Sequence, residues 1–259
     1  MKKHASQPGS VVYGLHAVHE LLLHRPGEVL TLWVCAENGP PSPALSEVMA
    51  SARQQGLSVQ TVTKQEINRR TQNGVHQNIA ASCLPFRYET DLLKPLQVAA
   101  SRQQRPLLLL LDGVTDPQNL GALIRSASVL GAHGVVLPQD RSAQVTPTTI
   151  KAAAGATCVV PIVSVANLVR AVDAYKEAGL WLLAAVAPGQ DGKPVWEHDL
   201  SVPLGVLLGG EESGLRKLVR KHSDLRAEIP MHAVLRGASL NVAAAGAILL
   251  YECMRQRQA

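Results

Sequence analysis

The stretch DPQNLGALIRSA, from Asp116 to Ala127, places an amide and a guanidinium where a strand is expected to pass into a helix. Five consecutive leucines precede it, and apolar residues at helical spacing follow. In α/β sheets, chemistry is usually found at the carboxyl ends of the strands. Asn119 is expected at or before the helix start and Arg125 about one turn into the helix, where they offer hydrogen bonds and a permanent positive charge. The alternative is an N-cap asparagine and a surface arginine.

A glycine pair and two glutamates follow a second apolar strand, in the stretch LLGGEESGL from Leu207 to Leu215. Glycine allows a ligand to approach the backbone closely. The pattern is neither GxGxxG nor a P-loop, because no Gly-Lys-Ser/Thr follows. Glu211 and Glu212 would repel a phosphate, so a ligand that carries positive charge fits this turn better. Alternatively, the two glutamates only complement the dipole of the next helix.

A third stretch of this kind joins IPM, from Ile229 to Met231, to ASLNVAAAG, from Ala238 to Gly246. Ser239 is a plausible N-cap for the last helix, and Asn241 is expected in its first turn, where backbone donors are free. The small residues that follow let another backbone come close, which is more often ordinary helix packing than catalysis. Capping alone is therefore the alternative interpretation.

Strands and helices alternate along the whole chain, which predicts parallel βαβ units. The pattern predicts a compact α/β domain over 1–87, a linker over 88–105 that mixes Pro, Ser, Gln and Arg, and a second α/β domain over 106–259. All three candidate stretches belong to the second domain, where they follow its strands.

Composition narrows the class of protein. Of 259 residues, 46% are hydrophobic and only 3% aromatic, so the core must consist of aliphatic residues, as in a covered parallel sheet. The four cysteines are far apart and predict reduced core thiols rather than disulfides or a zinc site. His16 and His19 are three residues apart, but no acid or cysteine at metal-ligand spacing accompanies them, so no metal is predicted. Neither a signal peptide nor a membrane span is found, which predicts a soluble cytoplasmic protein.

The net charge of +5 is unevenly distributed. Residues 1–105 hold 11 Lys and Arg against 7 Asp and Glu, whereas residues 106–259 hold 14 against 13. The sign of this excess favours a polyanionic partner, and its position favours residues 1–105 as the part that binds it.

Together the three stretches, in this order, resemble the SpoU/TrmH (SPOUT) family of RNA ribose 2′-O-methyltransferases. RSAQVTPTTIKAAAGA, from Arg141 to Ala156, is also similar to the family. VYGLHAVHELL and NGVHQNIAA resemble the small ribosomal-protein-like RNA-binding domain of its ribosomal RNA members. The resemblance covers nearly the whole chain. It departs in two places: seven residues rather than about five separate IPM from SLN, and Ala243 and Ala244 stand where Ser-Val is expected.

The resemblance implies a trefoil-knotted α/β methyltransferase domain that follows the RNA-binding domain, and a homodimer with the active site at the subunit interface. It implies methyl transfer from S-adenosylmethionine to the ribose 2′-hydroxyl of a guanosine in large-subunit (23S) ribosomal RNA. Residues that match its cofactor contacts are Gly209, Gly210, Ile229, Met231 and Leu240. Residues that match its proposed catalytic set are Asn119, Arg125, Glu211, Ser239 and Asn241.

Two alternatives stay open at this point. The first alternative is a transfer RNA methyltransferase of the same family. The second is an RNA-binding ribosome assembly factor that keeps the fold without catalysis. The presence of all five polar positions argues against the second alternative. The first domain argues for ribosomal RNA, but only by resemblance.

Overall fold

The computed structural model describes residues 10–35, 39–211, 213–232 and 239–258. The chain forms two compact units: Met1–Arg87 with Val145–Val159, and Tyr88–Gln144 with Val160–Ala259. The expected domain boundaries, which stay a prediction, differ from these units in two segments. Residues 88–105 pack within the second unit rather than forming a free linker, and residues 145–159 join the first unit.

The first unit is built on a four-stranded sheet with the order β1-β4-β2-β3. Its strands are β1 (Ser10–Tyr13), β4 (Ile79–Cys83), β2 (Val29–Cys35) and β3 (Val59–Val62). Its helices are α1 (Leu15–His24), α2 (Pro43–Gln54), α3 (Lys64–Arg70) and α6 (Pro147–Ala152), with 3-10 turns at Pro26–Glu28 and Ala156–Cys158. Alternating strand residues serve both faces: Leu32 and Val34 pack with α1 and α2, whereas Trp33 and Cys35 pack with Ile67 of α3.

This first sheet is mixed, so the prediction of parallel units throughout is wrong here. β2 pairs parallel with β3, but β4 runs antiparallel to both β1 and β2. Residues 63–78, which connect β3 to β4, contain the short helix α3, and the chain returns as β4 between β1 and β2. β1, with four residues, was too short for the sequence pattern to reveal.

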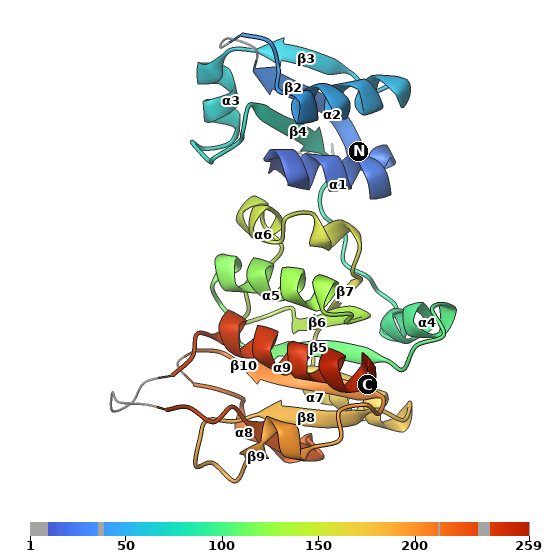
Figure 1. The fold of residues 1–259 in the computed structure, drawn as a ribbon, viewed down its shortest axis with the longest axis vertical. Helices are drawn as coiled ribbons and strands as arrows, with labels where there is room; N and C mark the ends of the chain where they lie inside the picture. The colour runs from blue at the N-terminus through green and yellow to red at the C-terminus, as the bar shows by residue number, and fades with distance from the viewer. Residues whose placement is uncertain (1–9, 36–38, 212, 233–238, 259) are drawn as a thin grey trace, which may run out of the picture. The chain divides into compact units, whose positions relative to one another are not determined.

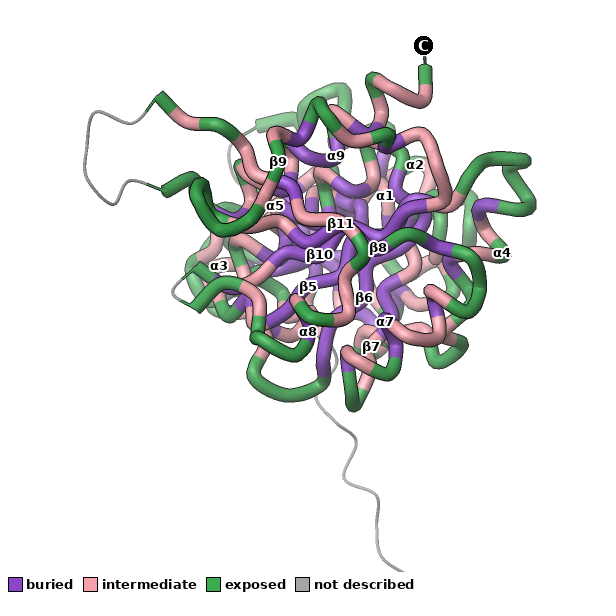
Figure 2. The backbone as a smooth tube through the Cα atoms, turned by 90° about the horizontal axis from the view of Figure 1, so that it is seen from below, coloured by how far each residue is buried: buried purple, intermediate pink, exposed green. Residues whose placement is uncertain are grey.

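The second unit is a seven-stranded sheet with the order β7-β6-β5-β10-β8-β11-β9 in which every pair is parallel, and this confirms the predicted parallel sheet. Its central strands β5 and β10 are buried (Figure 2). Its strands are β7 (Ile162–Val165), β6 (Gly134–Pro138), β5 (Leu107–Asp112), β10 (Leu204–Gly209), β8 (Trp181–Ala185), β11 (Leu225–Glu228) and β9 (Lys193–Pro194). Every residue of β5 is buried, as its unbroken leucine run predicts.

Helices cover both faces of the large sheet (Figure 1). They are α4 (Lys94–Ser101), α5 (Pro117–Val129), α7 (Leu168–Glu177), α8 (Lys217–His222) and α9 (Val242–Gln258), with a 3-10 turn at Val195–Glu197. Leu108 and Leu110 of β5 pack with α7 and α8 on one face. α5 and α9 pack against each other on the other, where Gly246 lies against Leu123 and Leu208. No helix in the described ranges is both long and apolar enough to cross a membrane.

Candidate active site at the carboxyl edge of the parallel sheet

The loops that leave β8, β10 and β11 surround a cavity of about 160 Å³ together with the residues that open α9. These strands are neighbours in a parallel sheet, so their carboxyl ends meet at one edge. All five residues predicted to contact the cofactor line this cavity, and two of the predicted catalytic residues line it as well: Gly209, Gly210, Ile229, Met231, Leu240, Glu211 and Ser239. We call it the apolar cavity, because Leu208, Val242 and alanines supply much of the remaining wall.

The glycine pair was expected to let a ligand approach the backbone, but the structure shows that neighbouring backbone requires it. A Cβ on Gly209 would overlap the backbone of Gly214 and Leu215, and a Cβ on Gly210 would overlap the carbonyl of Gly113. The Gly210 carbonyl accepts a hydrogen bond from the Gly214 amide at 2.9 Å, which closes the turn. The two glycines thus allow the 210–216 turn to fold tightly and to pack against the backbone of Gly113. The apolar cavity lies beside this turn.

An ion pair that the sequence interpretation missed holds the same turn. Asp112 ends β5, and its side chain is completely buried. Its carboxylate accepts one hydrogen bond from the Arg216 Nε at 2.6 Å and another from the Arg216 backbone amide at 2.9 Å. An acidic residue directly after five leucines was the available signal, because a buried carboxylate needs a partner. The pair ties the end of the 210–216 turn to β5.

Asn119 connects the three candidate stretches. Its Nδ2 donates to a carboxylate oxygen of Glu211, and its Oδ1 accepts from the Nδ2 of Asn241 at 3.1 Å. The Oδ1 of Asn241 in turn accepts from the backbone amide of Ala243 at 2.8 Å. These bonds fix the orientation of both amides, so that a chain of donors points toward the Glu211 carboxylate.

The helix caps differ from those expected. Asp116, not Asn119, caps α5, since its carboxylate accepts from the amides of Gln118 and Asn119. Asn241, not Ser239, caps α9, which begins at Val242. Asn119 is therefore already inside the first turn of α5, and its side chain is free to reach Glu211. Glu212 and residues 233–238 of the loop before Ser239 lie outside the described residues.

Arg125 is separated from this network. It lies in the third turn of α5 rather than about one turn in, because the helix begins at Pro117. Six residues of helix rotate a side chain by about 120° relative to Asn119, at 3.6 residues per turn. Arg125 is exposed and forms no hydrogen bond or ion pair with any other described residue. Within one chain, the structure thus brings together Asn119, Glu211 and Asn241 but leaves Arg125 outside.

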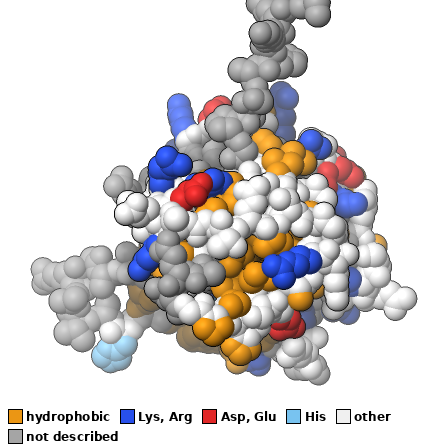
Figure 3. All heavy atoms as spheres, turned by 90° about the horizontal axis from the view of Figure 1, so that it is seen from above, with side chains coloured by type: hydrophobic (Ala, Val, Ile, Leu, Met, Phe, Trp, Pro, Cys, Tyr) orange, Lys and Arg blue, Asp and Glu red, His pale blue; other side chains and the backbone are white. Residues whose placement is uncertain are grey.

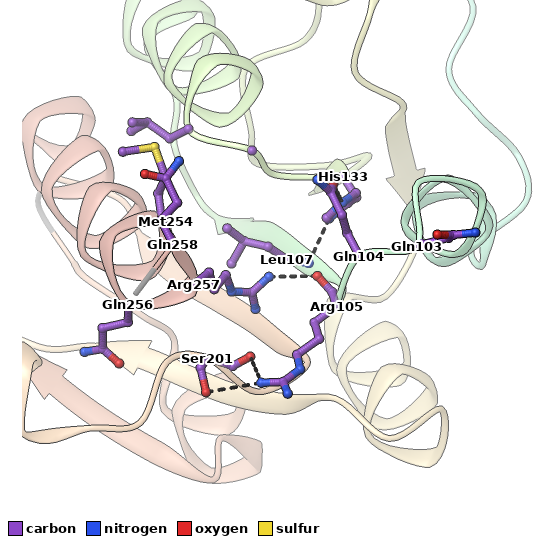
Figure 4. A pocket seen from close by; sticks show the side chains of 12 residues that line it. Gln103, Gln104, Arg105, Leu107, His133, Ser201, Met254, Gln256, Arg257 and Gln258 are labelled. Atoms are coloured by element: carbon purple, nitrogen blue, oxygen red, sulfur yellow. Dashed lines mark hydrogen bonds between the residues drawn. The ribbon is translucent and has the colours of Figure 1, made fainter.

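A larger cavity of about 610 Å³ lies at the opposite edge of the sheet, where β5 begins (Figure 4). Its polar side chains are bound to the protein itself. The Arg257 guanidinium donates to the carbonyls of Leu200, Val202, Arg105 and Pro106. His133 accepts from the Leu107 amide through Nδ1 at 3.0 Å and contacts Gln104 through Nε2. These bonds fasten α9 and the start of β5.

Burial, together with Arg102 and Arg257, lowers the pKa of His133 from 6.5 to about 4. His133 is thus neutral at physiological pH, with Nδ1 as acceptor, which suits a structural role. The four cysteines are free; burial raises the pKa of Cys83 and Cys253 to about 12. Across the described ranges, no group of three or more His, Cys, Asp or Glu side chains is placed to hold a metal ion.

Comparison with known proteins assigns the family. Residues 106–251 match the model of the SpoU rRNA Methylase family, and residues 11–89 match a model described as RNA 2'-O ribose methyltransferase substrate binding. The chain belongs to the SpoU rRNA methylase family. The cavity and the Asn119 network therefore lie in the methylase part of a SpoU protein.

Relatives match over nearly the full length. The chain is 36% identical over 247 residues to the 23S rRNA (guanosine-2'-O-)-methyltransferase RlmB of Pseudomonas putida, covering 95% of this chain and 96% of that protein. It is 35% identical to the RlmB of Escherichia coli, with 95% and 98% covered. The crystal structure of the SpoU methyltransferase AviRb from Streptomyces viridochromogenes in complex with the cofactor AdoMet superimposes with a TM-score of 0.75 at 26% identity, covering 96% of this chain and 90% of that chain.

Proposed function

We propose that this SpoU protein transfers a methyl group from S-adenosylmethionine to the ribose 2′-hydroxyl of a guanosine in 23S ribosomal RNA. The observation that carries the proposal is the union of the apolar cavity with the Asn119–Glu211–Asn241 network at one edge of a SpoU methylase sheet. The full-length similarity to proteins named RlmB supports ribosomal RNA and guanosine as the substrate. The place of action that follows is the cytoplasm, where ribosomal RNA is assembled into subunits.

The residues of the apolar cavity fit S-adenosylmethionine. Ile229, Met231 and Leu240 offer apolar surface for a flat heterocycle, and Gly209 and Gly210 expose backbone groups beside it. Glu211 lies at the wall of the cavity and places a negative charge where a sulfonium or ammonium group is favourable. When bound, the cofactor supplies an electrophilic methyl group on a positively charged sulfur.

The residues of the protein must then make a weak nucleophile react. A ribose hydroxyl needs to lose its proton as it attacks the methyl group. An arginine guanidinium is a permanent cation and a hydrogen-bond donor, so we assign Arg125 to the adjacent phosphate and to the negative charge that develops on the oxygen. The proton passes to water or to a neighbouring group. Asn119, Ser239 and Asn241 orient the hydroxyl, and much of the rate comes from holding both reactants in line.

We propose that the active form is a homodimer, in which Arg125 of one subunit reaches the active site of the partner subunit. The exposed surface of α5 and α9 carries the features that an interface needs. Val129 of α5 is 70% exposed, and Ile248 and Tyr251 of α9 are 39% and 54% exposed. The two helices pack against each other, so these apolar side chains belong to one helix layer that also bears Arg125. A partner subunit that covers this layer removes the apolar surface from water.

The same proposal includes a trefoil knot and a separate role for each domain. The knot is the arrangement that the family implies for the loops around the apolar cavity. The domain over 1–87 binds the RNA substrate, and the domain over 106–259 carries out methyl transfer.

On the face seen in Figure 3, lysine and arginine side chains are spread around apolar side chains rather than gathered in one place. Such a surface suits an RNA that is recognised by shape as well as by charge.

Two measurements on the purified protein test the proposal. Isothermal titration with S-adenosylmethionine should show binding without added metal. Transfer of a labelled methyl group should occur to 23S RNA and not to transfer RNA, and the product should resist alkaline cleavage at one nucleotide because its 2′-oxygen is blocked. Folded protein that binds no cofactor, or that methylates transfer RNA instead, would contradict the proposal.

A further inference from the structure

A second, polar cavity opens beside the apolar cavity. Its volume is about 430 Å³, and it lies between the loop after β8, the 210–216 turn and α8. The two cavities share Glu211, Gly214 and the segment 185–187 as a common wall. The rest of the polar cavity is lined mainly by Gln190, Ser213, Lys217 and Arg220. None of these four side chains belongs to the predicted cofactor or catalytic residues, so their presence beside Glu211 needs its own explanation.

The apolar cavity alone is too small for the whole cofactor. Pockets that enclose ligands of this size measure roughly 300–1,000 Å³, whereas the apolar cavity measures about 160 Å³. The adenine end matches its apolar wall. The amino-acid end carries a carboxylate and an ammonium group, and it needs a polar space that is continuous with the first. The polar cavity is the adjoining space of that kind.

The charges of the polar cavity match that amino-acid end. Lys217 is exposed, and Arg220 is half-buried with its guanidinium oriented by Gln190 Oε1 at 3.4 Å. Neither of the two cations forms an ion pair with a carboxylate among the described residues, in contrast to Arg216, which is bound to Asp112. Glu211 places a carboxylate at the junction with the apolar cavity. The cavity thus offers two cations for an anion and one anion for a cation.

We propose that the polar cavity binds the amino-acid end of S-adenosylmethionine. Lys217 and Arg220 hold its carboxylate, and Glu211 faces its ammonium group. Gln190 positions the Arg220 guanidinium. The inference rests on the proposed function, because it assigns further residues to the same cofactor.

The test compares ligands that differ only in this end. Isothermal titration is carried out on the full-length protein with S-adenosylmethionine, with S-adenosylhomocysteine and with methylthioadenosine, which lacks the amino-acid end. The variants Lys217→Ala and Arg220→Ala should each weaken both amino-acid-bearing ligands about tenfold, since hydrogen bonds to charged groups are lost. Methylthioadenosine should bind to the variants and to the wild type alike. Lys221→Ala is the matched control, because Lys221 is exposed on the same helix and does not line the cavity.

Four results are informative. A loss confined to the two ligands with the amino-acid end supports the inference. Equal losses for methylthioadenosine would overturn it, because the substitutions would then act through the fold, which thermal unfolding would also reveal. Unchanged binding of all three ligands, with weaker RNA binding, would overturn it in favour of an RNA phosphate in this cavity. A wild-type protein that binds none of the three ligands would contradict the proposed function itself. Failure of the proposed function is in this way distinguished from failure of the inference about the polar cavity.

Discussion

Arg125 is the residue whose role is most open to direct test. It is exposed on α5 and has no described partner within the chain, so its removal should leave fold and cofactor binding nearly unchanged. If Arg125 stabilises the reacting oxygen, Arg125→Ala should lower the single-turnover methylation rate by about a hundredfold or more. Arg125→Lys should not restore the rate, because lysine lacks the planar fork.

The alternative for Arg125 makes an opposite prediction. A surface arginine without function should change stability by no more than about 0.5 kcal/mol and leave the rate unaltered. A single-turnover assay with saturating RNA separates the two. A wild-type rate in Arg125→Ala would remove this residue from the mechanism.

The lowered pKa of His133 predicts how the stability of the protein depends on pH. Burial lowers its pKa from 6.5 to about 4 in the folded protein. Above pH 6.5 the imidazole is neutral in both states and contributes no pH dependence. Between pH 6.5 and 4 the unfolded chain takes up a proton that the folded chain does not, so stability should decrease as the pH falls. Each pKa unit corresponds to about 1.4 kcal/mol, so the total loss is a few kcal/mol at most.

His133→Asn is the variant that isolates this contribution. The asparagine Oδ1 can accept the hydrogen bond of the Leu107 amide but cannot titrate. Thermal unfolding between pH 7 and 4 should show a smaller decrease in Tm for the variant than for the wild type. Burial, Lys64 and Lys151 also lower the pKa of His76, which contributes equally to both proteins. Parallel Tm curves would argue against the assignment to His133.

At the scale of elements, the turn between β10 and α8 depends on its glycines. Gly209→Ala places a Cβ where the backbone of Gly214 and Leu215 lies, so the turn must move. We expect a loss of about 1–3 kcal/mol from overpacking, together with weaker cofactor binding, because the same turn forms a wall of the apolar cavity. Gly27→Ala is the control, since a Cβ there meets none of the described atoms within 4 Å. Equal Tm and cofactor affinity in both variants would contradict this account.

The elements also show how far sequence reasoning reaches. Unbroken apolar runs identified β5 and β10 almost to the residue, because a strand buried on both faces leaves an unmistakable pattern. Helix starts were less certain: Asp116, Pro117 and Asn119 lie within four residues, and the pattern could not decide which of two capping residues begins α5. Which side chain accepts hydrogen bonds from the first backbone amides of the helix depends on the local backbone and side-chain geometry, and in α5 this side chain is Asp116.

The contact between Asn119 and Glu211 could not be derived from the sequence without the resemblance. It depends on β10 lying next to β5, although the two strands are separated by about a hundred residues of chain. Strand order is set by how all helices pack on both faces, and no short pattern encodes it. For the same reason the Asp112–Arg216 pair and the polar cavity beside Glu211 emerged only from the structure.

At the scale of the whole molecule, the unequal charge predicts which part holds RNA. Lys64 and Arg69 of α3 are exposed in the first unit. Replacing both by glutamine should weaken RNA binding and flatten its dependence on salt by about 0.7–0.9 for each RNA phosphate that the protein no longer neutralises. The variant Arg170→Gln with Lys193→Gln removes the same charge from exposed positions of the second unit. Filter binding at several salt concentrations should show a larger change for the first pair; equal slopes would contradict the assignment.

The most direct test of the central proposal is a map of ribose methylation in 23S ribosomal RNA from a strain that lacks the gene for this protein. The account predicts that one 2′-O-methylguanosine disappears, that the wild-type gene restores it, and that a gene with Arg125→Ala does not. Unchanged methylation of 23S RNA in the strain without the gene, or a loss found only in transfer RNA, would contradict it.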